Sequence, residues 1–443
     1  MQFIRSLYFT QYLFYGLTTA VGLFLLAFVF PALLLLVKVA FGVFVVLALL
    51  DMLALFSQSK GVFARRSMAE KLSNGSYNDI LIYLENKYAF PIQAEIIDEL
   101  PFQFQKRDNL FKARVESGYT QVIHYTLRPT KRGSYRFGAI NVFVNGPLKL
   151  VKKRYRFAQD QEVPVYPSFL QMQQYELLAI TNRLHEMGVK KIRRIGHSAE
   201  FEQIRPYVAG DDQRTINWKA SARKSELMVN SFQDEKSQQV YCMIDKGRVM
   251  QMPFEGLTLL DYAINASLVL SNIALRKQDK AGILTFSEMI SNIVPAERKA
   301  TQLNRIMEVL YNQKTRFLES DYELLYAALR NKVKQRSLLL LFTNFETLNG
   351  AKRQLPYLRK IAKHHLLLVV FFENTELQAL LQQSTDSTEE VYVKAIAEKF
   401  DYEKKQIVKE LRQHGIQSIL TSPRHLTVNT INKYLEFKSR GMA

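Results

Sequence analysis

The chain of 443 residues has little cysteine, proline or glycine, and each shortage excludes a class of protein. The single cysteine, Cys242, excludes a disulfide framework and any zinc or iron–sulfur site built from several cysteines. Eighteen glycines and twelve prolines, with 48% hydrophobic residues, exclude collagen and a mainly disordered chain. The sequence also lacks a Walker-type glycine-rich loop, a His-Glu-x-x-His pair and a dinucleotide fingerprint. A packed protein of two or three domains remains.

One long stretch near the N-terminus is almost free of charge. From residue 12 to residue 56 the only ionisable side chains other than tyrosines are Lys38 and Asp51. This length is about twice the roughly 20 residues that a helix needs to cross a bilayer. Pro31 lies near the middle, where a proline ends one helix and begins the next. Lys38 and Asp51 lie near opposite ends of the second helix, so we expect both to reach the membrane interface. We predict a transmembrane hairpin at residues 1–57, with spans at about 12–30 and 33–55.

Basic residues flank the predicted hairpin on both sides, whereas the turn between its spans carries almost no charge. They are Arg5 before it and Lys60, Arg65, Arg66 and Lys71 after it. The positive-inside rule therefore predicts a protein of the bacterial cytoplasmic (inner) membrane, with two transmembrane helices and its soluble part in the cytoplasm. A signal peptide is the alternative, but the stretch is too long and has no clear small-residue cleavage site.

Residues 58–165 have the pattern of a small all-β domain. Short runs of β-branched and aromatic residues are separated by turn signals such as Asn145-Gly146-Pro147, with no helical pattern between them. This spacing predicts an immunoglobulin-like β-sandwich. The clearest strand candidates are residues 79–84, 93–97, 121–127 and 140–144.

The same domain carries much of the net charge of +19. Residues 102–160 contain thirteen basic and three acidic side chains. These charges have three interpretations: a solvated strand face, contact with anionic lipid headgroups, or contact with nucleic acid. No nucleic-acid motif accompanies them, so we expect no nucleic-acid partner. The candidates for facing anionic lipid are Lys152, Lys153, Arg154 and Arg156.

Residues 166–235 contain a dense group of charged, small and aromatic residues. Gly210-Asp211-Asp212 is a turn of the kind that glycine and aspartate favour, and the only tryptophan, Trp218, follows it. Bidentate arginine–carboxylate pairs here would form a buried structural network. Its candidates are Glu200, Arg205, Asp211, Arg214 and Arg223. A hydrolase centred on Gly210 and Asp211 is the alternative, but no nucleophile elbow or triad spacing surrounds them, so we predict no catalytic residue.

The order of these residues resembles the signature of the bacterial domain-of-unknown-function family 58. That signature looks like Glu-Phe, Arg-x-Tyr, Gly-Asp-x-x-Arg-x-Ile-x-Trp and Ser-Ala-Arg. The matching residues are Glu200, Phe201, Arg205, Tyr207, Gly210, Asp211, Arg214, Trp218, Ser221 and Arg223. The resemblance implies a membrane hairpin, a β domain, this signature region packed on the C-terminal domain, and a von Willebrand factor A-like domain. It also implies a partner, an AAA+ ATPase of the MoxR type.

Residues 236–443 independently predict an α/β domain. Fully apolar runs alternate with amphipathic helical patterns, which is typical of a doubly wound, mostly parallel sheet. The strand candidates are residues 240–244, 282–286, 290–294, 338–342, 366–372 and 417–420. The helix candidates are residues 257–276, 300–311, 322–333, 351–365, 389–414 and 428–438.

The resemblance also implies a metal site at the carboxyl ends of these strands, and the chain departs from that pattern. The A-like pattern is Asp-x-Ser-x-Ser, a threonine on a second loop and an aspartate after the fourth strand, which are oxygen ligands that suit Mg²⁺. Here the corresponding residues are Asp245, Gly247, Val249, Thr315 or Ser320, and Asn344. Both serines and one carboxylate are missing. We therefore expect a degenerate metal site and no cofactor, with weak Mg²⁺ binding at Asp245 as the alternative.

Together these features predict a membrane-anchored, non-enzymatic interaction or scaffold protein. The resemblance implies that it acts with a MoxR-family AAA+ ATPase in protein-complex assembly or envelope stress, and the strand-end face would be the binding surface. Two alternatives from other classes remain: a hydrolase using the Gly210-Asp211 motif, and a metal-dependent adhesion module facing outward.

Overall fold

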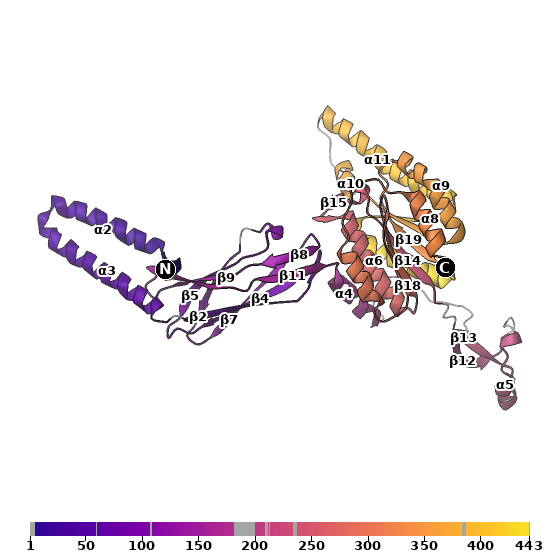
Figure 1. The fold of residues 1–443 in the computed structure, drawn as a ribbon, viewed down its shortest axis with the longest axis horizontal. Coiled ribbons are helices and arrows are strands. Elements are labelled where there is room, and N and C mark those ends of the chain that lie inside the picture. Colours follow the sequence, from indigo (N-terminus) through magenta and orange to yellow (C-terminus); the bar gives the residue numbers. More distant parts are fainter. Residues whose placement is uncertain are drawn as a thin grey trace. The chain divides into compact units, whose positions relative to one another are not determined.

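The computed structural model describes residues 5–58, 60–106, 109–180, 200–208, 211, 213–233, 237–382 and 387–442. The chain divides into two compact units, Met1–Tyr166 and Pro167–Ala443. The first unit contains the two N-terminal helices together with the β domain, and the second contains the α/β domain (Figure 1).

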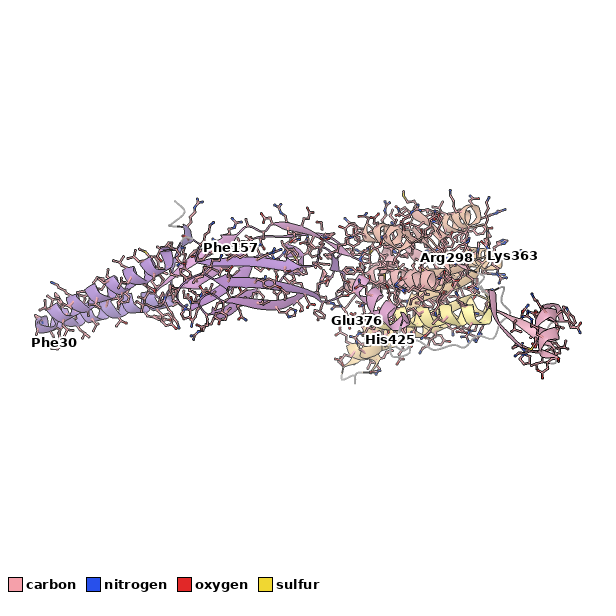
Figure 2. All side chains as sticks on the ribbon, turned by 90° about the horizontal axis from the view of Figure 1, so that it is seen from below. Phe30, Phe157, Arg298, Lys363, Glu376 and His425 are labelled. Carbon is pink, nitrogen blue, oxygen red and sulfur yellow. The ribbon has the colours of Figure 1, made fainter. Side chains whose placement is uncertain are left out.

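Two antiparallel helices begin the first unit. They are α2 (Gln11–Val29) and α3 (Leu34–Phe56), joined by the short 3-10 helix η1 (Pro31–Leu33). Phe24 and Phe41 meet edge to face with ring centroids 5.8 Å apart, and a Cβ at Gly16 would lie 2.5 Å from the Phe44 ring. Both helices are long and apolar enough to cross a membrane, which is compatible with the predicted anchor. Phe30 lies at the tip of this hairpin, away from Phe157 of the β domain (Figure 2).

The all-β prediction is confirmed, and the domain is a sandwich of sheets whose strands pair antiparallel except β3 with β11. One sheet has the order β2-β4-β7; opposite it lie β1-β10-β9-β5-β6 and β3-β11-β8. Alternate residues of β4 and β5 are buried, as expected for strands with one face on a core. The strands are β1 (Leu7–Phe9), β2 (Val62–Met68), β3 (Leu72–Ser73), β4 (Asn78–Asn86), β5 (Ile92–Asp98), β6 (Leu110–Val115), β7 (Thr120–Leu127), β8 (Gly133–Phe137), β9 (Ile140–Asn145), β10 (Val151–Phe157) and β11 (Gln161–Tyr166), and η2 (Phe102–Phe104) is a 3-10 turn.

The end of α3 is built into the β domain through Asp51, the residue predicted to reach the membrane interface. Asp51 is buried, and its carboxylate accepts hydrogen bonds from the backbone N–H groups of Leu148, Leu150 and Val151 at 2.8 to 3.0 Å. A Cβ at Gly146 would lie 2.2 Å from the Asp51 carboxylate, so only glycine allows this approach. The hairpin and the β domain are therefore joined by specific polar contacts.

The second unit is an α/β domain with a mixed, mostly parallel sheet, as predicted. The strand order is β18-β17-β14-β19-β20-β21, and only β18 runs antiparallel to its neighbour. These strands are β14 (Gln239–Asp245), β17 (Lys280–Phe286), β18 (Ile290–Glu297), β19 (Leu338–Phe342), β20 (Leu366–Phe372) and β21 (Gln417–Thr421). Small additions are the ribbon of β15 (Pro253–Phe254) and β16 (Leu257–Thr258), and the 3-10 turns η5 (Arg248–Met250) and η6 (Pro423–His425).

Helices cover both faces of this sheet (Figure 1). Alternate residues of β14 point to opposite cores: Cys242 and Ile244 to one, Tyr241 and Met243 to the other. The first core includes α4 (Phe169–Ile180), α6 (Leu259–Arg276), α7 (Gln302–Tyr311) and α12 (Leu426–Arg440). The second includes α8 (Tyr322–Lys332), α9 (Leu348–His364) and α11 (Thr388–Gln413), and α10 (Thr375–Leu381) contacts α11.

The signature segment forms a small hairpin with its own helix. Its elements are β12 (Glu200–Pro206), η4 (Gln213–Thr215), α5 (Trp218–Lys224) and β13 (Met228–Gln233). β12 and β13 pair antiparallel, while η4 and α5 contact β13. Packing of this hairpin on the α/β domain stays a prediction.

Candidate functional site

A single buried carboxylate meets three hydroxyl groups at the carboxyl ends of two neighbouring strands. Asp245 ends β14, is 1% exposed, and lies beside Thr343, which follows β19. Its Oδ1 accepts hydrogen bonds from the Ser320 hydroxyl and, at 2.8 Å, from the backbone N–H of Gly247. Its Oδ2 accepts from the hydroxyls of Thr343 at 2.7 Å and Tyr322 at 3.3 Å. We call Asp245 and these four donors the Asp245 cage.

The topology of the sheet explains the position of the cage. The chain passes from β14 to β17 on one side and later enters β19 on the other side of β14. The strand order therefore reverses beside β14, and α6 and α9, which follow β14 and β19, pack on opposite faces. In α/β sheets such a reversal leaves a crevice in which ligands bind. An open cavity of about 130 Å³ lies here, lined by Asp245 and Asn344 among others.

Burial and hydrogen bonding shift the pKa of Asp245 in opposite directions. The pKa of Asp245 is raised above its usual value because burial removes water from the ionised carboxylate, and the four hydrogen bonds from the cage offset only part of this shift. Burial and the neighbouring carboxylate raise the pKa of Tyr322 well above its usual value, so its hydroxyl stays protonated. An ionised carboxylate offers about four lone-pair sites, and Asp245 receives four donors. The cage thus satisfies the buried charge with groups of the protein itself.

Gly247 occupies a place where the A-like pattern has serine, and the hydroxyl comes from another loop instead. A Cβ at Gly247 would lie 2.3 Å from Ser320 Oγ and 3.1 Å from Asp245 Oδ1. Of the two candidates for the threonine place, Thr315 and Ser320, it is Ser320 whose hydroxyl donates to Asp245. Val249 is half-buried and packs against the core beneath α6.

Asn344 lies beside a lysine that the sequence did not single out. Lys404 of α11 donates from Nζ to Asn344 Oδ1 at 2.6 Å and lies 5.8 Å from the centre of the Phe371 ring. Burial lowers the pKa of Lys404 to about 8, while the nearby Glu346 carboxylate acts against that shift. The helical spacing could have predicted that Lys404 faces the sheet, because Lys404 falls on the same face of α11 as the buried Ile407.

The residues of the cage do not fit a magnesium ion. Mg²⁺ needs near-octahedral oxygen ligands with free lone pairs. Asp245 supplies the only carboxylate of the cage and already accepts four donors, while Asn344 Oδ1 accepts from Lys404. Within the part of the chain that the structure describes, no group of three or more His, Cys, Asp or Glu side chains is placed to hold a metal.

Charged residues from three segments form the rim of the cavity. Glu319 accepts from Arg248 at 3.3 Å and from Arg353 at 3.0 Å. Arg248 follows β14, Glu319 precedes α8, and Arg353 belongs to α9, so the pairs bridge the crevice. All three side chains are more than half exposed, so the rim presents charge to solvent above a closed cage.

The signature hairpin contains a bidentate ion pair. Arg205 donates to both oxygens of Asp211 at 2.8 and 2.6 Å, and the backbone N–H of Val208 donates to Asp211 at 2.9 Å. The Arg205 side chain is 39% exposed and Arg223 is exposed, which corrects the expectation of a buried network that includes both. Gly210 and the side chains of Glu200, Phe201 and Arg214 lie outside the described residues.

Asn217 and Ser221 close the same hairpin. Asn217 Oδ1 caps α5 by accepting from the backbone N–H of Ala220 at 3.0 Å, and its Nδ2 donates to Asn230 at 2.8 Å. The Ser221 hydroxyl accepts from the backbone N–H of Met228 at 2.8 Å and donates to the Asn217 carbonyl. In addition, the backbone N–H of Tyr207 donates to the Leu227 carbonyl at 2.8 Å.

Not every signature residue has such a structural role. Trp218 is 70% exposed, and Arg223 projects from the same short helix. Exposed tryptophan and arginine are the residue types enriched in protein interfaces. The signature therefore divides into residues that hold the hairpin and residues that it presents.

The predicted lipid-facing basic residues are mostly engaged within the β domain. Lys153 is buried and donates to the carbonyls at the end of α3, which corrects its assignment to the lipid surface. Lys152 pairs with Glu95 at 2.8 Å, and Arg154 donates to Asn141. Arg156 is exposed.

Residues 203–407 match the model of the family described as "Protein of unknown function DUF58". This match bears out the resemblance to that family inferred from the signature. The uncharacterized protein YeaD of Bacillus subtilis (strain 168) is 27% identical over 203 residues, which are 44% of this chain and 50% of that protein. The chain thus spans about half the length of this curated relative.

Two solved structures are similar to a smaller part of the chain. The CARDB domain of the PF1109 protein from Pyrococcus furiosus is 13% identical, with a TM-score of 0.17, and covers 24% of this chain and 91% of its own. The PapD-like domain 7 of human CEP192 is 17% identical, with a TM-score of 0.18, and covers 24% of this chain and 84% of its own.

Proposed function

We propose that this chain, whose residues 203–407 belong to the DUF58 family, is a membrane-anchored, non-enzymatic interaction protein. Its partner on this proposal is an AAA+ ATPase of the MoxR type, and its role is in protein-complex assembly or envelope stress. The proposal includes a von Willebrand factor A-like fold for the α/β domain. The strand order supports this fold, since the sheet reads 3-2-1-4-5-6 when its strands are numbered along the chain.

The observation that carries the proposal is the saturated carboxylate at the switch point of the sheet. A catalytic carboxylate needs a free oxygen within reach of its substrate, whereas both oxygens of Asp245 are bound by the cage. The cage instead fixes the loops that carry Arg248 and Glu319, and Glu319 pairs with Arg353 of α9 to complete the charged rim. A fixed charged rim above a crevice is suited to recognising another protein without a metal ion.

The membrane part of the proposal is supported by the two apolar helices and their flanks. Both helices return to the β domain, with η1 at the opposite end of the hairpin (Figure 1). Arg5 and Lys60 are exposed in the segments that flank the hairpin, and Arg65 is exposed in β2. Lys71 is exposed beyond the other end of β2, where its Nζ lies 4.8 Å from the centre of the Tyr166 ring. Arg66 is buried and paired with Asp98, so it does not contribute to this flank. The positive-inside rule then favours a bacterial inner-membrane protein with both soluble units in the cytoplasm.

Co-purification with matched charge variants tests the partner and its binding face. The full-length chain is isolated from native membranes in mild detergent, and the recovered ATPase is identified by mass spectrometry. We expect Arg353→Glu on the rim to lower ATPase recovery about tenfold or more, since reversing an interfacial charge places like charges opposite each other, which costs several kcal/mol. The control is Arg336→Glu, which is expected to have no effect. Arg336 is exposed just before β19, at the amino ends of the parallel strands and therefore away from the rim.

Two outcomes would contradict parts of this proposal. Equal ATPase recovery with both charge variants would show that the rim is not the binding face. Recovery without any AAA+ ATPase would refute the partner.

A further inference from the structure

Both N-terminal helices bind the same short turn of the β domain, the β9–β10 turn (residues 146–150). Thr10, directly before α2, donates from its hydroxyl to the carbonyls of Lys149 at 2.6 Å and Leu150 at 3.0 Å. From the other helix, Asp51 accepts backbone N–H groups of the same segment. The turn is therefore held between the start of the first helix and the end of the second.

Helix length places this turn at the edge of a bilayer. The hydrocarbon core is about 30 Å thick, which a helix crosses in about 20 residues. Helix α2 has 19 residues and starts directly after Thr10. Counting about 20 residues from Pro31, at the tip of the hairpin, leads to Asp51 on the return path. Both ends of the hydrocarbon span thus coincide with the residues that hold the β9–β10 turn.

The side chains around this turn have the composition of a membrane interface. Leu148 is 47% exposed at the turn, and Phe9 and Tyr12 are exposed beside the start of α2. Lys149 is exposed next to them, and Arg5 is exposed before β1. Aromatic residues with lysine and arginine are enriched where a protein passes from hydrocarbon to headgroups, and each basic residue near an anionic surface gains about 1 kcal/mol.

The backbone of the turn holds these side chains in place before any lipid arrives. The N–H of Gly146 donates to the Val151 carbonyl at 2.9 Å, and the N–H of Lys149 donates to the Gly146 carbonyl at 3.0 Å. Lys149 adopts a positive φ of 59°, a tight-turn conformation. An exposed apolar side chain on such a turn buries its surface in lipid with little loss of backbone freedom.

We infer that the β9–β10 turn is a membrane-inserting element that binds an anionic lipid surface, with Leu148 among the acyl chains and Lys149 among the headgroups. This inference rests on the membrane anchor of the proposed function. It also replaces Lys152, Lys153 and Arg154, which are engaged within the β domain, as the lipid-contacting residues.

Depth-dependent quenching of a single tryptophan tests the inference. The full-length Trp218→Phe chain, which lacks its only natural tryptophan, is reconstituted in phosphatidylcholine–phosphatidylglycerol vesicles with or without lipids brominated on their acyl chains. Tryptophan is then placed at one position at a time by Leu148→Trp, Val43→Trp or Tyr77→Trp. Val43 is an exposed residue in the middle of the second span. Tyr77 is exposed before β4, about 30 Å along that strand from the end that pairs with Val62.

We expect brominated lipid to quench the probes at 148 and 43 several-fold more strongly than the probe at 77. Quenching at 43 but not at 148 would overturn the inference and leave the anchor intact. Absence of quenching at 43 would refute the anchor itself, and with it this inference. A nitroxide at Leu148→Cys gives a second readout on a smaller side chain: greater accessibility to oxygen than to a water-soluble nickel complex supports insertion, and the reverse contradicts it.

Discussion

Single polar residues in this protein are defined by the partners that satisfy them. Asp245 looks in sequence like the remnant of a metal site, but in the fold it accepts four donors of the protein. Gly247 is required there by space rather than by backbone conformation, since its φ of −65° is open to any residue. The absence of a side chain at residue 247 therefore leaves the space that the Ser320 hydroxyl occupies beside Asp245.

A double-mutant cycle at Gly247 and Ser320 tests this arrangement. Gly247→Ala is expected to destabilise the α/β domain by about 1–3 kcal/mol, because the new Cβ displaces the Ser320 hydroxyl from a buried carboxylate. Ser320→Ala is expected to cost a similar amount through the lost donor. The double variant is expected to cost clearly less than the sum, because each change removes the same hydrogen bond. Hydrogen–deuterium exchange of β14 in the full-length chain measures the free energy of opening.

The control for this cycle is Gly350→Ala in α9, on the rim of the same cavity. Its Cβ would meet only Thr347 Oγ1, at 3.3 Å, so a small effect is expected. Strictly additive costs at residues 247 and 320 would contradict the shared hydrogen bond.

At the scale of elements, the joint between α3 and the β domain is a polar clamp at the end of an apolar helix. Asp51→Asn is expected to destabilise this joint by roughly 2–3 kcal/mol. The two carboxylate oxygens of Asp51 accept from three backbone N–H groups, and in asparagine an NH₂ group, which cannot accept, replaces one of them. Amide exchange at Leu148, Leu150 and Val151 in the full-length chain in lipid nanodiscs should then accelerate more than tenfold.

Lys38→Met on the same helix is the matched control. Lys38 is exposed, and its substitution also removes a charge from α3, so it should leave exchange at the β9–β10 turn unchanged. Equal acceleration by both variants would attribute the effect to the charge of the helix rather than to the clamp.

The elements themselves were accessible from sequence, whereas their polar contacts were not. Leu338–Phe342 is a fully apolar run and forms a fully buried strand, because its residue types alone decide its environment. Lys153, in contrast, is buried because its ammonium reaches the carbonyls of Leu55 and Gln58, almost a hundred residues earlier. The same holds for Lys404 and Asn344, which meet only after α11 packs on the sheet. Local patterns predict elements, but such pairs depend on tertiary packing.

At the scale of the whole molecule, the net charge of +19 matters through the basic residues that lie close to the apolar helices. Some basic side chains of the β domain form ion pairs within the domain, such as Arg66 with Asp98 and Lys152 with Glu95. Exposed ones such as Lys60 and Lys149 adjoin the hairpin, and in the orientation that we propose they lie in the cytoplasm. The proposed orientation of the chain in the membrane therefore rests on a small number of exposed residues rather than on the total charge.

Cysteine labelling in intact cells tests that orientation. The chain has a single native cysteine, so labelling can be assigned to the introduced one. Cys242 is buried, and burial raises the pKa of its thiol to about 12, so the native chain should not react with a membrane-impermeant maleimide. Ala32→Cys, exposed at the tip of the hairpin, is expected to be labelled in intact cells with a permeable outer membrane. Tyr77→Cys in the β domain is expected to be labelled only after the inner membrane is opened. The reverse pattern would place both soluble units outside the cytoplasm and favour the outward-facing adhesion module instead.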